Sequence, residues 1–143
     1  MSCHPCTVTA PVQLVIFDLM GTLIVDDGIV DRAYETALEQ AGMAPGTPGH
    51  RSAADRIEAL LGRPTLVVLT EALGDPVRAE EASWAFDDAI HAAVPSLRAN
   101  PGADATLAEL ASRKIALAVT TSFTSDVRKA VLEQMGWTDT FDA

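Results

Sequence analysis

Two short stretches of the chain are almost wholly apolar, and each ends in a polar turn. Residues 12–17 are β-branched and aromatic with little alternation, and residues 115–119 form a second run of this kind. Such runs are typical of strands buried on both faces, as in a parallel sheet. The polarity rises at once, with Asp18, Gly21 and Thr22 after the first run and residues 120–122, Thr-Thr-Ser, after the second.

Between these runs the apolar positions recur at helical spacing. The pattern and its capping residues predict helices over residues 28–41, 52–61, 76–94, 104–112 and 125–135. Residues 43–50, with two prolines and two glycines, are predicted to form a loop. Residues 66–69 have the composition of a strand but lie within a helical array, and we favour a helix there.

This order of elements predicts an α/β fold, with a parallel sheet and crossover helices. We expect residues 25–96 to form a helical cap, joined by hinges near Val25 and Ser96 to a core of residues 11–24 and 97–143. Residues 1–10 are expected to be a flexible tail. Cys3 and Cys6 fall in this tail, and no second Cys or His pair follows to complete a structural zinc site. Residues 141–143 resemble the approach to another strand.

Charge and hydropathy narrow the classes of partner. Ten basic and twenty acidic side chains give a net charge of −10, which argues against nucleic acid or an anionic membrane as the main partner. No apolar run approaches the roughly 18 residues of a membrane span, and the N-terminus lacks a secretory pattern. A cytoplasmic location is therefore expected. A phosphorylated substrate is still compatible with this negative charge, because the N–H groups of a loop together with a cation can hold phosphate on an acidic protein.

The polar turns predict a site at one edge of the sheet. Ligands of parallel sheets bind at the carboxyl ends of the strands, where Asp18 and Thr121 are expected to meet. A carboxylate in this place attacks an electrophile, while N–H groups of the loop through Gly21 and Thr22 hold the transferring group. The plainer alternatives are that Asp18 caps its own loop and that Thr121 forms a turn or helix cap.

At this point the residues show a resemblance. Residues 18–23, Asp-Leu-Met-Gly-Thr-Leu, resemble the first motif of the haloacid dehalogenase-like hydrolase superfamily, usually Asp-x-Asp-Gly-Thr-Leu. Residues 101–123 are similar to its second-motif region, and the helical insert is similar to its small cap. Residues 26–30, the Thr-Thr-x-Phe stretch and the Met-Gly-Trp stretch most resemble the phosphonatase-like branch. The resemblance spans residues 12–143 and implies a partial Rossmann-like parallel sheet core with an inserted helical cap.

The resemblance implies a role for each matching residue. Asp18 is the nucleophile and a Mg²⁺ ligand, and the Met20 carbonyl is a second Mg²⁺ ligand. One carboxylate and one carbonyl are few ligands for octahedral Mg²⁺, so its binding is expected to be weak. Thr121 binds the phosphoryl group, with Thr120 as the alternative register. The further substrate-binding positions are Gly21, Thr22, Thr120 and Ser122. The implied reaction is hydrolysis of a phosphorylated small molecule, a phosphate ester or a phosphonate, through an aspartyl intermediate.

The sequence departs from the family pattern in three ways. Met20 occupies the position of the usual general acid–base, and its loss costs about 10²–10⁴ in rate. The only lysines, Lys114 and Lys129, lie outside the cap, so phosphonoacetaldehyde cleavage through a Schiff base is not expected. The third and fourth motifs follow the second in the family, and the sequence ends at Ala143 before either. We therefore expect a truncated, impaired chain that lacks a C-terminal half or forms an oligomer.

Two other functions stay open. One is a metal-independent dehalogenase-type hydrolase that also uses Asp18, and the other is a non-catalytic remnant or interaction module with an open sheet edge. Among the remaining side chains, His50 and Arg51 either face the substrate or lie on the surface. Trp84 and Phe86 are expected in the core of the cap rather than on a base-stacking surface.

Overall fold

The computed structural model describes residues 11–143, so the predicted tail with Cys3 and Cys6 lies outside the described residues. Two parallel strands, six α-helices and a 3₁₀ helix make up the described part. In chain order they are β1 (Leu14–Asp18), α1 (Ile29–Gln40), α2 (Pro48–Leu60), α3 (Thr65–Leu73), α4 (Pro76–Ala93), η1 (Val94–Ser96), α5 (Ala103–Ser112), β2 (Ala116–Thr120) and α6 (Ser125–Met135). The predicted α/β fold class is confirmed.

The two strands pair in parallel, as the sequence predicts. Their register runs from Leu14 opposite Ala116 to Asp18 opposite Thr120. The chain end lies along the second edge of β2, where Asp142 N donates to the Leu117 carbonyl at 2.8 Å. Both lateral edges of β2 therefore make backbone hydrogen bonds. The two polar turns leave the sheet at the same end, where both strands have their carboxyl ends.

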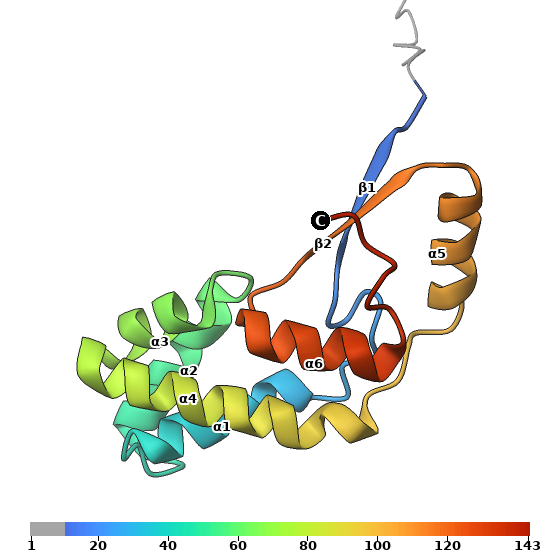
Figure 1. Cartoon of the computed structure of the whole chain (residues 1–143). Coiled ribbons are helices and arrows are strands. Elements are labelled where there is room, and N and C mark those ends of the chain that lie inside the picture. The colour runs from blue at the N-terminus through green and yellow to red at the C-terminus, as the bar shows by residue number, and fades with distance from the viewer. Residues whose placement is uncertain (1–10) are drawn as a thin grey trace, which may run out of the picture.

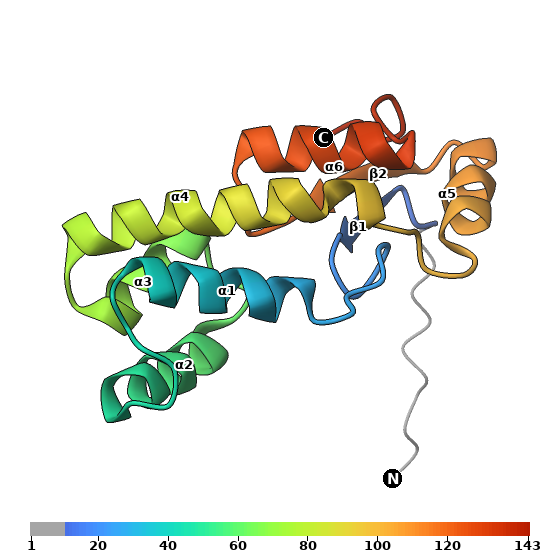
Figure 2. The same ribbon diagram turned by 90° about the horizontal axis from the view of Figure 1, so that it is seen from below.

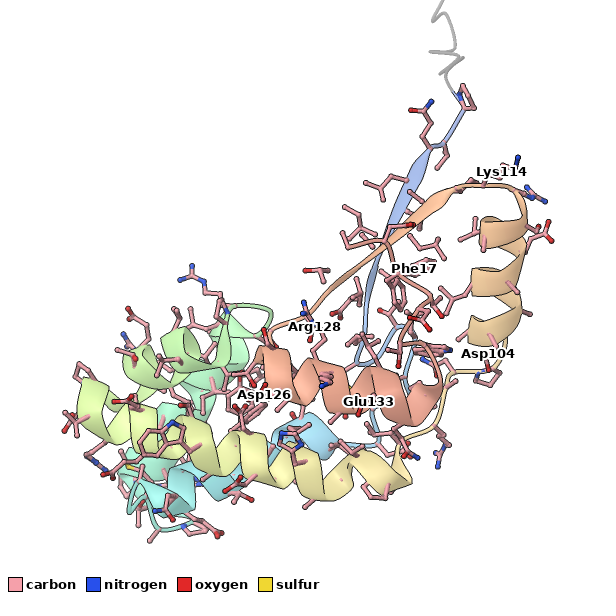
Figure 3. The ribbon with its side chains drawn as sticks, viewed as in Figure 1. Phe17, Asp104, Lys114, Asp126, Arg128 and Glu133 are labelled. Atoms are coloured by element: carbon pink, nitrogen blue, oxygen red, sulfur yellow. The ribbon has the colours of Figure 1, made fainter. Side chains whose placement is uncertain are left out.

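One face of β1 differs from the prediction. Leu14 and Ile16 point to the same face and are 50% and 62% exposed, whereas Phe17 is half-buried against the core. Figure 3 shows Phe17 in the space between β1 and α6. The expectation that β1 is buried on both faces is wrong for residues 11–143, because no described element covers the face of Leu14 and Ile16.

Helices α1–α4 gather at one end of the molecule, and we call them the four-helix unit (Figure 1). Helix α1 packs along α4, where the rings of Tyr34 and Phe86 lie 4.6 Å apart between their centroids. Helix α4 begins as expected, with the Asp75 carboxylate accepting from the N–H groups of Val77 and Arg78. The helix favoured over residues 66–69 is confirmed as part of α3.

Helix α2 begins earlier than the sequence predicts. The Thr47 hydroxyl accepts from His50 N–H at 3.2 Å, and Pro48 takes the first helical position. Proline suits this position because its missing N–H has no partner there in any helix. The predicted loop is therefore confirmed for residues 43–47 but wrong for residues 48–50, which are helical, and the predicted helix start at Ser52 is wrong. Within residues 11–143 no helix has the length and apolarity needed to cross a bilayer.

The four-helix unit joins the sheet through two adjacent segments. Val25 N donates to the Arg98 carbonyl at 3.0 Å, and Asn100 N donates to the Leu23 carbonyl at 2.8 Å. Figure 2 shows α1 and α4 side by side, each leading back towards the strands. The first segment follows the carboxyl end of β1, and the second, which leads from η1 into α5, pairs with it through a bridge between Ile24 and Ala99. The four-helix unit therefore lies next to the polar turn after β1.

Candidate functional site

A cavity of about 520 Å³ opens at the carboxyl ends of the two strands, and we call it the strand-end cavity. Its strand-side wall consists of Asp18, Met20 and residues 120–123. Its helix-side wall consists of Asp26, Val30, Tyr34, Leu61, Gly62 and Pro64. The sequence correctly predicts that Asp18 and Thr121 lie at the same end of the sheet, since Asp18 is opposite Thr120 in the strand register.

The Asp18 carboxylate has no hydrogen-bond or ion-pair partner among the described residues. The loop that follows it is closed by the backbone, with Leu23 N and Ile24 N each donating to the Leu19 carbonyl at 2.9 Å. A capping role for Asp18 is therefore not what the geometry shows. The carboxylate is exposed and lines the strand-end cavity, where a ligand can reach it.

Gly21 and Thr22 shape this loop rather than line the cavity. Gly21 has a φ of +78°, in the left-handed region that favours glycine. Its N–H donates to the Ile24 carbonyl at 2.8 Å, and Thr22 N–H donates to the Leu19 carbonyl at 3.3 Å. Because both donors are engaged, these two amides do not hold a transferring group as the sequence interpretation required.

Thr120, Thr121 and Ser122 all line the cavity. Thr121 Oγ1 accepts from Phe123 N–H at 3.2 Å, so the turn that the sequence left as an alternative is present. That bond uses a lone pair of the hydroxyl and leaves its O–H to donate elsewhere. A phosphoryl oxygen is an acceptor suited to such a donor.

The turn after β2 is tied to the four-helix unit by two hydrogen bonds. Thr65 Oγ1, at the start of α3, donates to the Ser122 carbonyl at 3.4 Å. Thr124 Oγ1 donates to Asp87 Oδ2 of α4 at 2.9 Å. The first turn of α6 follows, and Figure 3 shows Asp126 at the end of α6 nearest the four-helix unit. These bonds fix the helix-side wall against the strand-side wall.

The helix-side wall is uncharged apart from Asp26. Burial raises the pKa of the Tyr34 phenol, an effect that its hydrogen bond to Thr65 partly offsets, so Tyr34 is neutral near pH 7. Asp26 Oδ1 accepts from Ile29 N–H at 2.9 Å and thereby caps α1. The spacing of Asp26 before α1 signals this cap, but the sequence interpretation gave neither Tyr34 nor Leu61 a role.

The donors for a divalent cation are few. Within residues 11–143 no group of three or more His, Cys, Asp or Glu side chains is placed to hold a metal. Asp18 and Met20 line the same cavity, and the Met20 carbonyl accepts no hydrogen bond from the described backbone. Mg²⁺ is commonly held by one or two carboxylates, with water and substrate phosphate as the remaining ligands. A carboxylate and a free carbonyl fit that kind of site.

Other polar and aromatic residues lie away from this cavity. His50 is buried, and its Nε2 lies 2.7 Å from Glu35 Oε2, so it neither faces the cavity nor lies on the surface. Phe86 is fully buried as expected, but Trp84 is 60% exposed, so its predicted place in the core is wrong. Trp84 lines a separate hollow of about 700 Å³ with acidic side chains that include Asp87 and Asp126.

Comparisons with known proteins agree with this architecture. A family model for haloacid dehalogenase-like hydrolases matches residues 12–143. No curated protein matches the sequence. Among solved structures, a predicted phosphatase from Clostridium acetobutylicum is similar, with 22% identity and a TM-score of 0.73 over 94% of this chain and 60% of that chain.

Two further solved structures are similar at lower identity. CbbY from Rhodobacter sphaeroides, in complex with phosphate, is 18% identical with a TM-score of 0.70, over 92% of this chain and 62% of that chain. A haloacid dehalogenase-like family hydrolase from Streptococcus pneumoniae is 18% identical with a TM-score of 0.65, over 92% and 59% of the two chains. This chain thus spans about 60% of the length of these structures.

Proposed function

Because the chain belongs to the haloacid dehalogenase-like hydrolase family, we propose that it is a phosphoryl-transfer hydrolase that uses Asp18 as its nucleophile. The observation that carries the proposal is the strand-end cavity, in which an unpartnered Asp18 carboxylate shares one wall with the Thr121 hydroxyl. Similar structures named as phosphatases, and one that contains phosphate, support a phosphorylated small molecule as the substrate.

The proposed reaction has two steps. An oxygen of Asp18 attacks phosphorus, the bond from phosphorus to the leaving oxygen breaks, and the departing alkoxide takes a proton from water. Water then attacks phosphorus, the aspartyl oxygen leaves as the carboxylate, and phosphate is released. Thr121 donates its O–H to a phosphoryl oxygen in both steps, which stabilises the charge that develops there.

We include Mg²⁺ in the proposal, with the Asp18 carboxylate and the Met20 carbonyl as its protein ligands. When bound there, the cation neutralises negative charge on the phosphoryl group. Asp18 and Asp26 both line the strand-end cavity, and no basic side chain of the described part of the chain does. A dianionic phosphate therefore needs a counter-charge that the described residues do not supply, and this supports the choice of a metal.

Met20 sets the expected rate of the second step. A thioether carries no proton at neutral pH, so no side chain at this position activates the attacking water. General acid–base groups contribute about 10²–10⁴ in rate, and we expect hydrolysis of the aspartyl phosphate to be slowed by that order. The phosphorylated enzyme should therefore accumulate.

A quenched-flow experiment tests the proposal. The chain is mixed with p-nitrophenyl phosphate and Mg²⁺, quenched in acid and examined by intact mass for one added phosphoryl group. We expect the group on the unaltered chain and on Asp55→Asn, an exposed aspartate outside the cavity, but not on Asp18→Asn. A phosphoryl group that persists in Asp18→Asn would show that another residue is the nucleophile.

We also propose that the chain belongs to the phosphonatase-like branch of the family. Phosphonates are therefore the second class of substrate to test. A Schiff-base route is not included, because neither Lys114 nor Lys129 lines the strand-end cavity. Figure 3 shows Lys114 where α5 leads into β2, far from the four-helix unit. A cytoplasmic location, an oligomer and a further C-terminal part stay predictions.

The dehalogenase-type alternative is favoured by one observation. Within residues 11–143 a single unpartnered carboxylate, without a metal-binding group of three acidic or imidazole side chains, faces the cavity. An oxygen of Asp18 would then attack the halogen-bearing carbon of a halogenated carboxylic acid, the carbon–halogen bond would break with release of halide, and water would hydrolyse the resulting ester, without any metal. Chloride release from 2-chloropropionate in the presence of a chelator, lost in Asp18→Asn, would support this function over phosphoryl transfer.

A further inference from the structure

The helix-side wall of the strand-end cavity has a chemistry of its own. Val30, Leu61 and Pro64 present apolar surface to the cavity, and Tyr34 presents a neutral aromatic ring. Phe123 and Met20 add apolar surface from the strand-side wall. Since the phosphoryl group lies at Asp18 and Thr121 in the proposed function, the part of the substrate beyond it lies against this apolar surface.

Leu61 is the exposed apolar side chain of that wall. It is 50% exposed, in the link between α2 and α3, whereas the preceding Leu60 is half-buried against the core. A single exposed leucine is common on protein surfaces and needs no explanation by itself. Leu61 differs because it lines a cavity whose other wall carries Asp18. Any apolar group of a ligand in the cavity covers Leu61 and removes it from water.

A second negative charge on the ligand finds no cationic side chain in this cavity among the residues that the structure describes. Among residues 11–143, the ionisable side chains that line it are Asp18, Asp26 and Tyr34, and none of them is a cation near pH 7. Arg128 on α6 does not line the cavity, and Figure 3 shows it pointing away from α4. A substrate with both a phosphate and a carboxylate would therefore bring an unpaired anion next to two carboxylates, which like-charge repulsion opposes.

We infer that the strand-end cavity selects phosphate monoesters of apolar, uncharged alcohols, and that Leu61 is the residue that sets this preference. The inference rests on the proposed function, because it assumes that the phosphoryl group binds at Asp18 and Thr121. Substrates with a second anionic group are rejected, for want of a cation in the helix-side wall.

Binding of three small probes to the whole chain tests the inference. Inorganic phosphate, butyl phosphate and 2-phosphoglycolate are titrated in the presence of Mg²⁺, and NMR follows the amides of residues 120–124 and the methyl groups of Leu61. Burying two methylenes of the butyl chain predicts binding about tenfold tighter than inorganic phosphate. Repulsion predicts that 2-phosphoglycolate binds about tenfold more weakly than butyl phosphate.

A pair of matched variants isolates Leu61. Leu61→Arg adds a cation to the helix-side wall, and it should lower the affinity for butyl phosphate and raise that for 2-phosphoglycolate about tenfold each. Leu66→Arg makes the same change at a leucine that is 47% exposed on α3 and does not line the strand-end cavity. This control should keep the unaltered preference. Both side chains are exposed, and the amide spectrum of each variant verifies its fold.

The outcomes separate the inference from the proposed function. If all three probes shift residues 120–124 with equal affinity, the inference is overturned while the phosphoryl site stands. If the two arginine variants behave alike, the role of Leu61 is overturned. If no probe shifts residues 120–124, the proposed function itself fails and the inference fails with it.

Discussion

Replacing Met20 by aspartate restores a proton carrier beside the proposed nucleophile. Met20 lies two positions after Asp18, is half-buried and lines the strand-end cavity with it. The substitution leaves the backbone carbonyl of residue 20 in place, so the proposed magnesium ligand is kept. The change therefore acts on proton transfer and on the packing of a single side chain.

The magnitude follows from these two effects. A positioned general base contributes about 10²–10⁴ in rate, so we expect the aspartyl phosphate of Met20→Asp to break down at least about 10²-fold faster. The new carboxyl would share the cavity with Asp18 and Asp26, and repulsion between like charges raises its pKa towards the range useful for proton transfer. Losing about half of the burial of a methionine costs about 1 kcal/mol of unfolding free energy.

Single-turnover kinetics measure the effect. The chain is phosphorylated, excess donor is removed, and the decay of the phosphorylated form is followed by intact mass at several pH values. Met20→Asn is the matched control, because its side chain has nearly the same size and the same packing loss but no base. Equal decay rates for the aspartate and asparagine variants would refute the reasoning, since they would show that proton transfer at residue 20 does not limit hydrolysis.

Two further predictions concern the four-helix unit. Burial is the main cause that raises the pKa of Asp87, and it outweighs the opposing effects of Thr124 and His91. The contribution of the Asp87 carboxyl to stability is therefore present at low pH and is lost as the pH rises through that raised pKa. Asp87→Asn should therefore have a higher melting temperature than the unaltered chain at pH 7, and the difference should vanish near the ordinary aspartate pKa of about 4. A difference that stays constant with pH would contradict this reasoning. Phe86→Ala should lower the unfolding free energy by about 3–5 kcal/mol in urea denaturation, because Phe86 is fully buried against Tyr34. Trp84→Ala, on the same helix but exposed, should change it by no more than about 0.5 kcal/mol, and equal losses would contradict the packing.

The strand ends were predictable because their signals are local. Uninterrupted apolar runs followed by polar turns predict buried parallel strands, and parallel strands bring their carboxyl ends to one edge. Asp18 and Thr121 therefore could be placed together without any knowledge of tertiary contacts. The start of α4 was equally local, since Asp75 and Pro76 carry the capping signal themselves.

The helix-side wall was not predictable, because it depends on how the helices dock. Helical spacing shows that Tyr34 lies on the apolar face of α1, but not that this face also reaches the cavity. The spacing predicts Leu61 as the last residue of a helix, whereas in the structure it lies just after α2, and nothing in the sequence indicates that it lines a cavity. Burial of β1 was overestimated for the same reason, since the exposure of Leu14 and Ile16 depends on which elements cover that face.

The two walls of the cavity depend on one another through the turn after β2. The same turn carries Thr121, accepts from Thr65 of α3 and donates from Thr124 to α4. Each such hydrogen bond contributes about 1 kcal/mol net, so these two bonds together favour the observed placement of the four-helix unit by only about 2 kcal/mol. A ligand that orders Thr121 therefore also favours the observed position of Leu61 in the opposite wall of the cavity. For this reason substitutions at Met20 and Leu61, which line one cavity from different walls, should not be treated as energetically independent.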